Sequence, residues 1–98
     1  MHEGIDIANR YGADIIAPAD GYVVFAGVKS GYGKLVIIDH GKGWNTLLTG
    51  LGAVSARIGE TVAQGDTVGT TPPARATITV ELRRDGRPID ILALLSAD

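Results

Sequence analysis

The chain has 98 residues, nine basic against eleven acidic, a formal net charge of −2 and no cysteine. A chain of this length forms one domain with one core. The small net charge supplies no field for attracting nucleic acid or an anionic membrane surface. The absence of cysteine excludes disulfides and thiolate metal ligands. No apolar run approaches the about 20 residues of a membrane span, so we expect no such span in this chain.

Fourteen glycines separate short runs that are rich in Val, Ile and Leu, which favours strands over helices. Ser30-Gly31-Tyr32-Gly33 has the glycine content that a tight hairpin turn needs. A helical turn or two is expected only over residues 89–95. The predicted strands cover residues 14–17, 22–26, 35–39, 45–48, 54–57, 67–68 and 77–83.

A weak internal repeat divides the chain into two similar parts. Residues 12–15 lead to residues 20–23, and residues 59–62 lead to residues 65–68; in both cases a Gly precedes a β-branched residue, a turn follows, and a second strand begins. Two half-barrels packed together produce such a pattern. The predicted fold is therefore all-β, a two-sheet β-sandwich or barrel-sandwich hybrid.

Four stretches resemble the LytM/lysostaphin-type zinc metallopeptidase family in order and spacing: residues 2–8 (HEGIDIA), 16–21 (IAPADG), 31–41 (GYGKLVIIDHG) and 80–90 (VELRRDGRPID). Together they span nearly the whole chain. The resemblance implies the family fold, with its duplicated hybrid motif, and a single LytM-like domain over residues 1–98. It also implies that these residues are part of a longer protein of the cell envelope.

In this family a His-x-x-x-Asp motif supplies two zinc ligands, and His2 and Asp6 match it. A His-x-His on a late strand supplies the third ligand and a catalytic histidine, but these positions read Thr77 and Thr79. A further catalytic histidine follows the middle strand, where this chain has Gly50. Catalytic zinc sites normally have three protein ligands plus water. Two surviving ligands predict a vestigial site that binds zinc weakly at best, no catalytic residues and no required cofactor.

Side chains two positions apart on a strand point to the same side. On the late strand the apolar residues 78, 80 and 82 should therefore face the core. The alternating residues should face a groove, and these are Thr77, Thr79, Glu81 and Arg83.

Family members that have lost zinc ligands resemble EnvC, an activator of N-acetylmuramoyl-L-alanine amidases in cell separation. In that branch a tyrosine of the Gly-Tyr-Gly turn and an arginine of the last strand belong to the partner-binding surface. Tyr32 and Arg83 match them, whereas Glu3 and Asp6 differ in type from two other contacts. The resemblance implies a non-catalytic murein hydrolase activator of the periplasm or envelope. Its partner would be an amidase or another cell-wall hydrolase, with peptidoglycan as a further candidate.

Two other functions remain open at this stage. A residual zinc endopeptidase would use His2, Asp6 and an unconventional third ligand. A carrier module would need a modifiable lysine at a hairpin tip, but Lys34 follows its turn. We expect His40, at the end of a strand, to have a hydrogen-bonding structural role, because family members carry it outside the metal shell.

Overall fold

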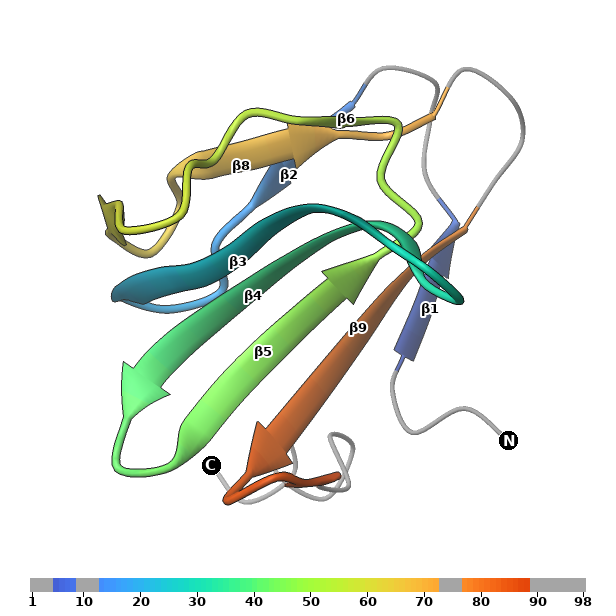
Figure 1. The fold of residues 1–98 in the computed structure, drawn as a ribbon. Coiled ribbons are helices and arrows are strands. Elements are labelled where there is room, and N and C mark those ends of the chain that lie inside the picture. The colour runs from blue at the N-terminus through green and yellow to red at the C-terminus, as the bar shows by residue number, and fades with distance from the viewer. Residues whose placement is uncertain (1–4, 9–12, 73–76, 89–98) are drawn as a thin grey trace.

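The computed structural model of the protein describes residues 5–8, 13–72 and 77–88. Within these ranges the chain forms ten strands and no helix, so no helix there could cross a membrane (Figure 1). The strands are β1 (Ile5–Ala8), β2 (Asp14–Ile16), β3 (Gly21–Lys29), β4 (Gly33–Gly41), β5 (Trp44–Thr49), β6 (Ala53–Val54), β7 (Thr61–Val62), β8 (Thr67–Thr70), β9 (Thr77–Arg84) and β10 (Arg87–Pro88).

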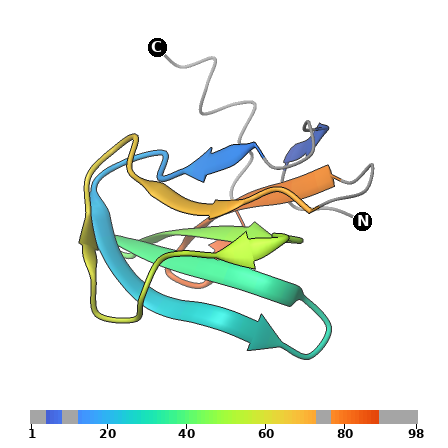
Figure 2. The same ribbon diagram turned by 90° about the horizontal axis from the view of Figure 1, so that it is seen from above.

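The strands build two antiparallel sheets. The large sheet has seven strands in the order β1-β9-β5-β4-β3-β7, with β10 pairing to β9. The small sheet has the order β2-β8-β6. Seen from above, the small sheet lies over one face of the large sheet, and the β3–β4 hairpin extends on the other side (Figure 2). The expected two-sheet, all-β architecture is confirmed.

The core fills the space between the two sheets. Alternate residues of the large sheet point into it, and Val36, Ile38 and Ile78 are at most 2% exposed. The small sheet contributes Val68, which is fully buried, and Ile15. Such alternation is what a sheet with one covered face requires. It confirms that Ile78 and Val80 on β9 face the core, whereas Leu82 is half-buried.

The internal repeat has a structural counterpart. Each repeat contributes one strand to each sheet: β2 and β3 come from the first, and β7 and β8 come from the second. The strands pair between the repeats, β2 with β8 and β3 with β7. The two halves are therefore interlocked, and neither can complete its sheets without the other.

Seven predicted strands are present, with ends that differ by one to three residues for most of them. The strand expected over residues 54–57 is only Ala53–Val54, because the backbone from Ser55 onward bonds to Val68 O rather than continuing a ladder. Three short strands were not predicted, β1, β7 and β10. The helical turn expected over residues 89–95 lies outside the described residues.

The hairpin expected around residues 30–33 joins β3 to β4. Gly31 and Gly33 have φ values of 87° and 72°, in a region of positive φ that residues other than Gly rarely adopt. Tyr32 N donates to Lys29 O at 3.0 Å and closes the turn. The glycines of the Gly-Tyr-Gly motif are thus needed for the turn that presents Tyr32.

Candidate functional site

The face of the large sheet that points away from the small sheet carries the family's site positions. Residues directly opposite one another in antiparallel strands share a face. One row across this face runs from Asp6 on β1 through Thr79 on β9 and Thr49 on β5 to Leu35 on β4. We call this face the groove face.

Two more rows complete the groove face. Glu81 on β9 lies opposite Leu47 on β5, which lies opposite Ile37 on β4. In the next row, Arg83 lies opposite Asn45, which is followed by Asp39 on β4. The prediction that Thr79, Glu81 and Arg83 share one side of the late strand is therefore supported by the register of three strands.

The β3–β4 hairpin curves across the groove face (Figure 1). The Tyr32 hydroxyl lies near enough to Arg83 on β9 to raise the pKa of Arg83, so the hairpin tip reaches over the sheet toward β9. Leu35 and Leu47 are 1% and 6% exposed although the small sheet covers the opposite face. These two side chains are therefore covered on the groove face itself, which is apolar at Leu35 and Leu47 and polar along β9.

Of the positions that bind zinc in the family, the described residues bring two side by side, Asp6 and Thr79. The register places Asp6 beside Thr79 on neighbouring strands, β1 and β9. Thr79 is half-buried and carries a hydroxyl where the family has an imidazole. His2 lies outside the described residues, and Asp6 and Thr77 are described by their backbone alone. A threonine hydroxyl is not among the ligands that zinc prefers.

Gly50 follows β5 directly and bounds the groove face at the end of that strand. Its φ of 83° is in the left-handed region, and its N–H donates to Lys34 O at 3.1 Å. Gly50 has no side chain that could donate, accept or ligate. Among the described residues, no group of three His, Asp or Glu side chains is arranged to hold a metal ion.

His40 lies on the opposite, inner face and is bonded through both ring nitrogens. Nδ1 lies 2.7 Å from Asp20 O, and Nε2 lies 2.6 Å from Thr46 Oγ1. A carbonyl oxygen only accepts, so Nδ1 carries the proton, and in the neutral ring Nε2 accepts from the Thr46 hydroxyl. Thr46 is 2% exposed. The contacts agree with the structural role expected for His40, but the sequence alone did not indicate Thr46 as its partner.

Arg83 is bound by groups of its own chain. Its Nε donates to Glu81 Oε2 in an ion pair. The hydrogen bond to Glu81 is the main reason why the pKa of Arg83 is raised above its ordinary value, and the Tyr32 hydroxyl raises it further, while partial burial opposes both. The guanidinium is charged at every accessible pH. The sequence placed Tyr32, Glu81 and Arg83 on one surface but did not indicate that they bind one another.

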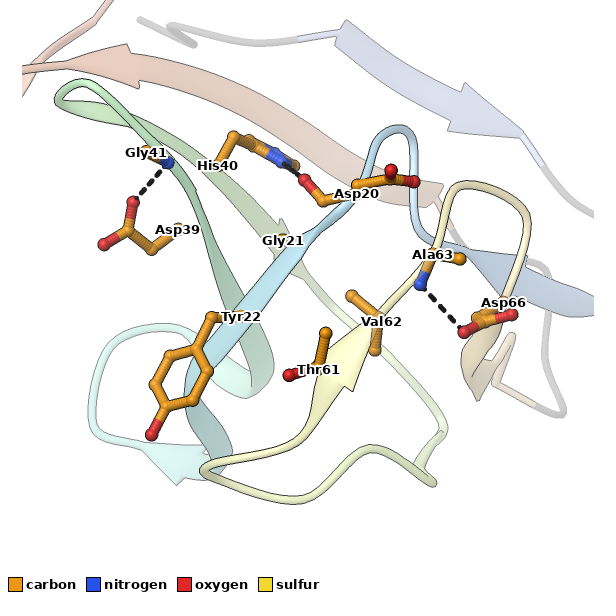
Figure 3. Close-up of a pocket in the computed structure, with 10 residues that line it drawn as sticks. All are labelled: Asp20, Gly21, Tyr22, Asp39, His40, Gly41, Thr61, Val62, Ala63 and Asp66. Atoms are coloured by element: carbon orange, nitrogen blue, oxygen red, sulfur yellow. Dashed lines mark hydrogen bonds between the residues drawn. The ribbon is translucent and has the colours of Figure 1, made fainter.

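A shallow depression of about 740 Å³ lies at the opposite edge of the large sheet, between β3, β4 and β7 (Figure 3). Its three aspartates face turns. Asp20 Oδ1, Asp39 Oδ1 and Asp66 Oδ2 accept hydrogen bonds from backbone N–H groups at 2.8–2.9 Å. This pattern is typical of turn-stabilising aspartates. The depression is therefore built from structural contacts, and it meets the groove face only at Asp39.

The order of motifs along the chain and the interlocked sheets agree with a comparison against protein-family models. The model of peptidase family M23 matches residues 1–91. The chain belongs to peptidase family M23. The expected relation to LytM/lysostaphin-type peptidases is thereby confirmed at the level of the family.

Curated relatives of this M23 domain include activators and an enzyme. It is 35% identical to the lipoprotein NlpD/LppB homolog of Pseudomonas aeruginosa over 97% of its own length and 33% of that protein. It is 35% identical to the murein hydrolase activator NlpD of Escherichia coli over 96% of its length and 26% of the relative. It is 37% identical to the DD-carboxypeptidase/endopeptidase Mpg of Neisseria meningitidis over 92% of its own length and 22% of that protein. The chain thus spans a third or less of these relatives.

Solved structures confirm the fold. The M23 domain aligns with a putative peptidase M23 from Pseudomonas aeruginosa with a TM-score of 0.87 and 26% identity, over 99% of this chain and 44% of that one. It aligns with lysostaphin from Staphylococcus simulans with a TM-score of 0.86 and 19% identity, over 99% of this chain and 45% of lysostaphin. At 19% identity the second likeness concerns the fold alone. The activators among the relatives above are named NlpD, and the assignment to an EnvC-like branch stays a prediction.

Proposed function

We propose that this M23 domain is non-catalytic and that it binds and activates a peptidoglycan hydrolase, an N-acetylmuramoyl-L-alanine amidase, in the cell envelope. The observation that carries the proposal is the pair of positions Thr79 and Gly50. Both border the groove face where the family has histidines, and neither offers an imidazole. The similarity to murein hydrolase activators named NlpD supports the same function.

Activation without chemistry requires a difference in affinity. The domain must bind the open state of the hydrolase more tightly than the closed state, because a ligand shifts an equilibrium only by its differential affinity. The groove face offers suitable anchors. Tyr32 is 43% exposed, and the Arg83 side chain is 31% exposed. Tyrosine and arginine provide much contact area and dominate many interfaces.

The envelope location rests on the same relatives. One of them is named a lipoprotein and others are named murein hydrolase activators, and both names refer to the envelope. We propose the periplasm or another envelope compartment for this chain as well, with a cell-wall hydrolase as the partner and peptidoglycan as a possible second ligand. The assignment of residues 1–98 to a longer envelope protein is part of the same proposal.

The decisive experiment measures dye release from labelled peptidoglycan sacculi. The chain is treated with a chelator and desalted, and is then mixed with a purified amidase that keeps its own metal. We expect no release by the chain alone and a several-fold increase in release by the amidase when the chain is added. Release by the chain alone that returns when zinc is added would contradict the proposal.

A zinc endopeptidase is the second candidate function. The 37% identity to a DD-carboxypeptidase/endopeptidase supports it, as do the retained His2 and Asp6. Metal analysis of the purified chain separates the two functions. We expect well under one zinc per chain, whereas close to one zinc per chain would favour the enzyme.

A designed third ligand tests why zinc binding should be weak. Thr79 lies opposite Asp6, so Thr79→His would add an imidazole beside the retained motif. Three protein ligands are what zinc sites normally have, so zinc affinity should rise by at least about tenfold, a scale typical for site-supporting groups. Arg84→His on the other face of β9 is the matched control and should leave affinity unchanged. Equal affinities of the two variants would contradict the assignment of position 79 to the metal site.

A further inference from the structure

Arg83 interacts with two neighbouring side chains of its own chain, Glu81 and Tyr32. Glu81 and Arg83 are two residues apart on β9 and point to the same side. Arg83 Nε donates to Glu81 Oε2, and the Tyr32 hydroxyl lies near enough to the guanidinium to raise its pKa. The cation that would anchor a partner is thus already engaged by an acid of the same chain.

The two charges differ in exposure. The Glu81 side chain is 14% exposed and lies opposite Leu47, which is buried. The Arg83 side chain is 31% exposed and lies opposite Asn45. A molecule that approaches from solvent therefore meets the guanidinium more readily than the carboxylate. Glu81 contacts the Nε edge, and the guanidinium carries five N–H donors in all.

The chemistry of Arg83 favours an anionic group on the incoming molecule. A guanidinium can bind a carboxylate through two parallel hydrogen bonds, which fixes direction as well as strength. The nearest other acid of the Arg83 row, Asp39, is engaged in its own turn, where Oδ1 accepts from Gly41 N at 2.8 Å. A partly exposed ion pair such as Arg83–Glu81 is weak, so an incoming carboxylate can replace Glu81.

We propose that Glu81 acts as a built-in competitor for Arg83, and that the partner hydrolase docks by placing one of its own acidic side chains on the guanidinium in place of Glu81. This inference rests on the proposed function and names the chemistry of the contact. A protein partner is favoured over a glycan strand because the hairpin beside Arg83 exposes two large apolar side chains, with Tyr32 43% and Val28 72% exposed. Glu81 then sets the concentration at which docking begins.

The test titrates the chain against a purified N-acetylmuramoyl-L-alanine amidase and dye-labelled sacculi. Glu81→Gln keeps the shape of the side chain and removes its charge, so the concentration for half-maximal activation should fall by about fivefold, the factor that corresponds to a partly exposed ion pair. Arg83→Ala should raise it. In the double variant the benefit of Glu81→Gln should vanish, because the cation that it frees is absent.

Glu60→Gln is the matched control. It removes the same charge next to β7, at the opposite edge of the large sheet, where Glu60 Oε1 accepts from Arg57 N. It should leave the titration unchanged. If Glu81→Gln weakens activation, Glu81 itself contacts a cation of the partner and the inference is wrong. The inference is equally wrong if Glu81→Gln changes nothing, or if it strengthens binding of the chain to sacculi without amidase. No activation by the unmodified chain would instead refute the proposed function, and the inference with it.

Discussion

Removing the hydroxyl of Thr46 should destabilise the fold through His40. Thr46 is 2% exposed, and its Oγ1 lies 2.6 Å from His40 Nε2. Because Nδ1 donates to Asp20 O, the neutral ring needs a donor at Nε2. In Thr46→Val that acceptor loses its hydrogen-bond donor at a partly buried contact. Such a group costs about 1–3 kcal/mol, which for a domain of this size lowers Tm by roughly 4–8 °C per kcal/mol.

Urea unfolding followed by circular dichroism measures this loss. The midpoint should fall while the slope m stays unchanged, because the surface exposed on unfolding is the same. Thr46→Ser is the matched control. It keeps the donor and loses one methyl group, worth about 0.8 kcal/mol, so it should remain more stable than the valine variant.

A double variant isolates the contact itself. His40→Leu combined with Thr46→Val replaces both partners by apolar groups, which is less costly than leaving one partner unpaired. Its loss should therefore be smaller than the sum of the single losses. Equal stability of the valine and serine variants would refute the reasoning, and so would imidazole nitrogen shifts that show the proton of His40 on Nε2.

Two further predictions concern the core. Gly21→Ala should lower the free energy of unfolding by about 1–3 kcal/mol, the usual effect of overpacking. A Cβ at this position would lie 2.6 Å from Ile38 Cγ2 and 2.7 Å from Asp39 O. A midpoint of urea unfolding equal to that of the unmodified chain would contradict this prediction. Ile78→Ala should lower the free energy of unfolding by about 2–5 kcal/mol, because Ile78 is 2% exposed. Val28 is 72% exposed, so Val28→Ala should change stability by less than about 0.5 kcal/mol. Thermal unfolding measures both changes.

Local patterns in the sequence were sufficient for the strands that carry the core. β9 alternates apolar and polar residues, which identifies both the strand and its buried side, whereas β4 was recognised by its continuous apolar run Leu35-Val36-Ile37-Ile38. β1, β7 and β10 escaped prediction because each has only two to four residues. Strands that short are defined by the ladder of a neighbour, which sequence does not display.

The candidate site was predictable only as a set of positions. The resemblance to the family placed Thr79, Glu81 and Arg83 on one strand, and the alternation of that strand put them on one side. The contacts between Arg83 and Tyr32, and between His40 and Thr46, could not be predicted. They depend on how a hairpin curves over the sheet and on the register between strands, and neither is encoded by spacing along the chain.

The position of β9 between β1 and β5 has a consequence for how the molecule acquires its shape. The groove face is completed only when β9 enters between β1 and β5, two strands that precede it in the sequence. Pairings between distant segments form slowly because the intervening loop must first be closed. A ribosome-bound chain that still lacks β9 has no complete groove face. The surface proposed to recognise a hydrolase therefore arises only after β9 has been made and has paired with both of its neighbours.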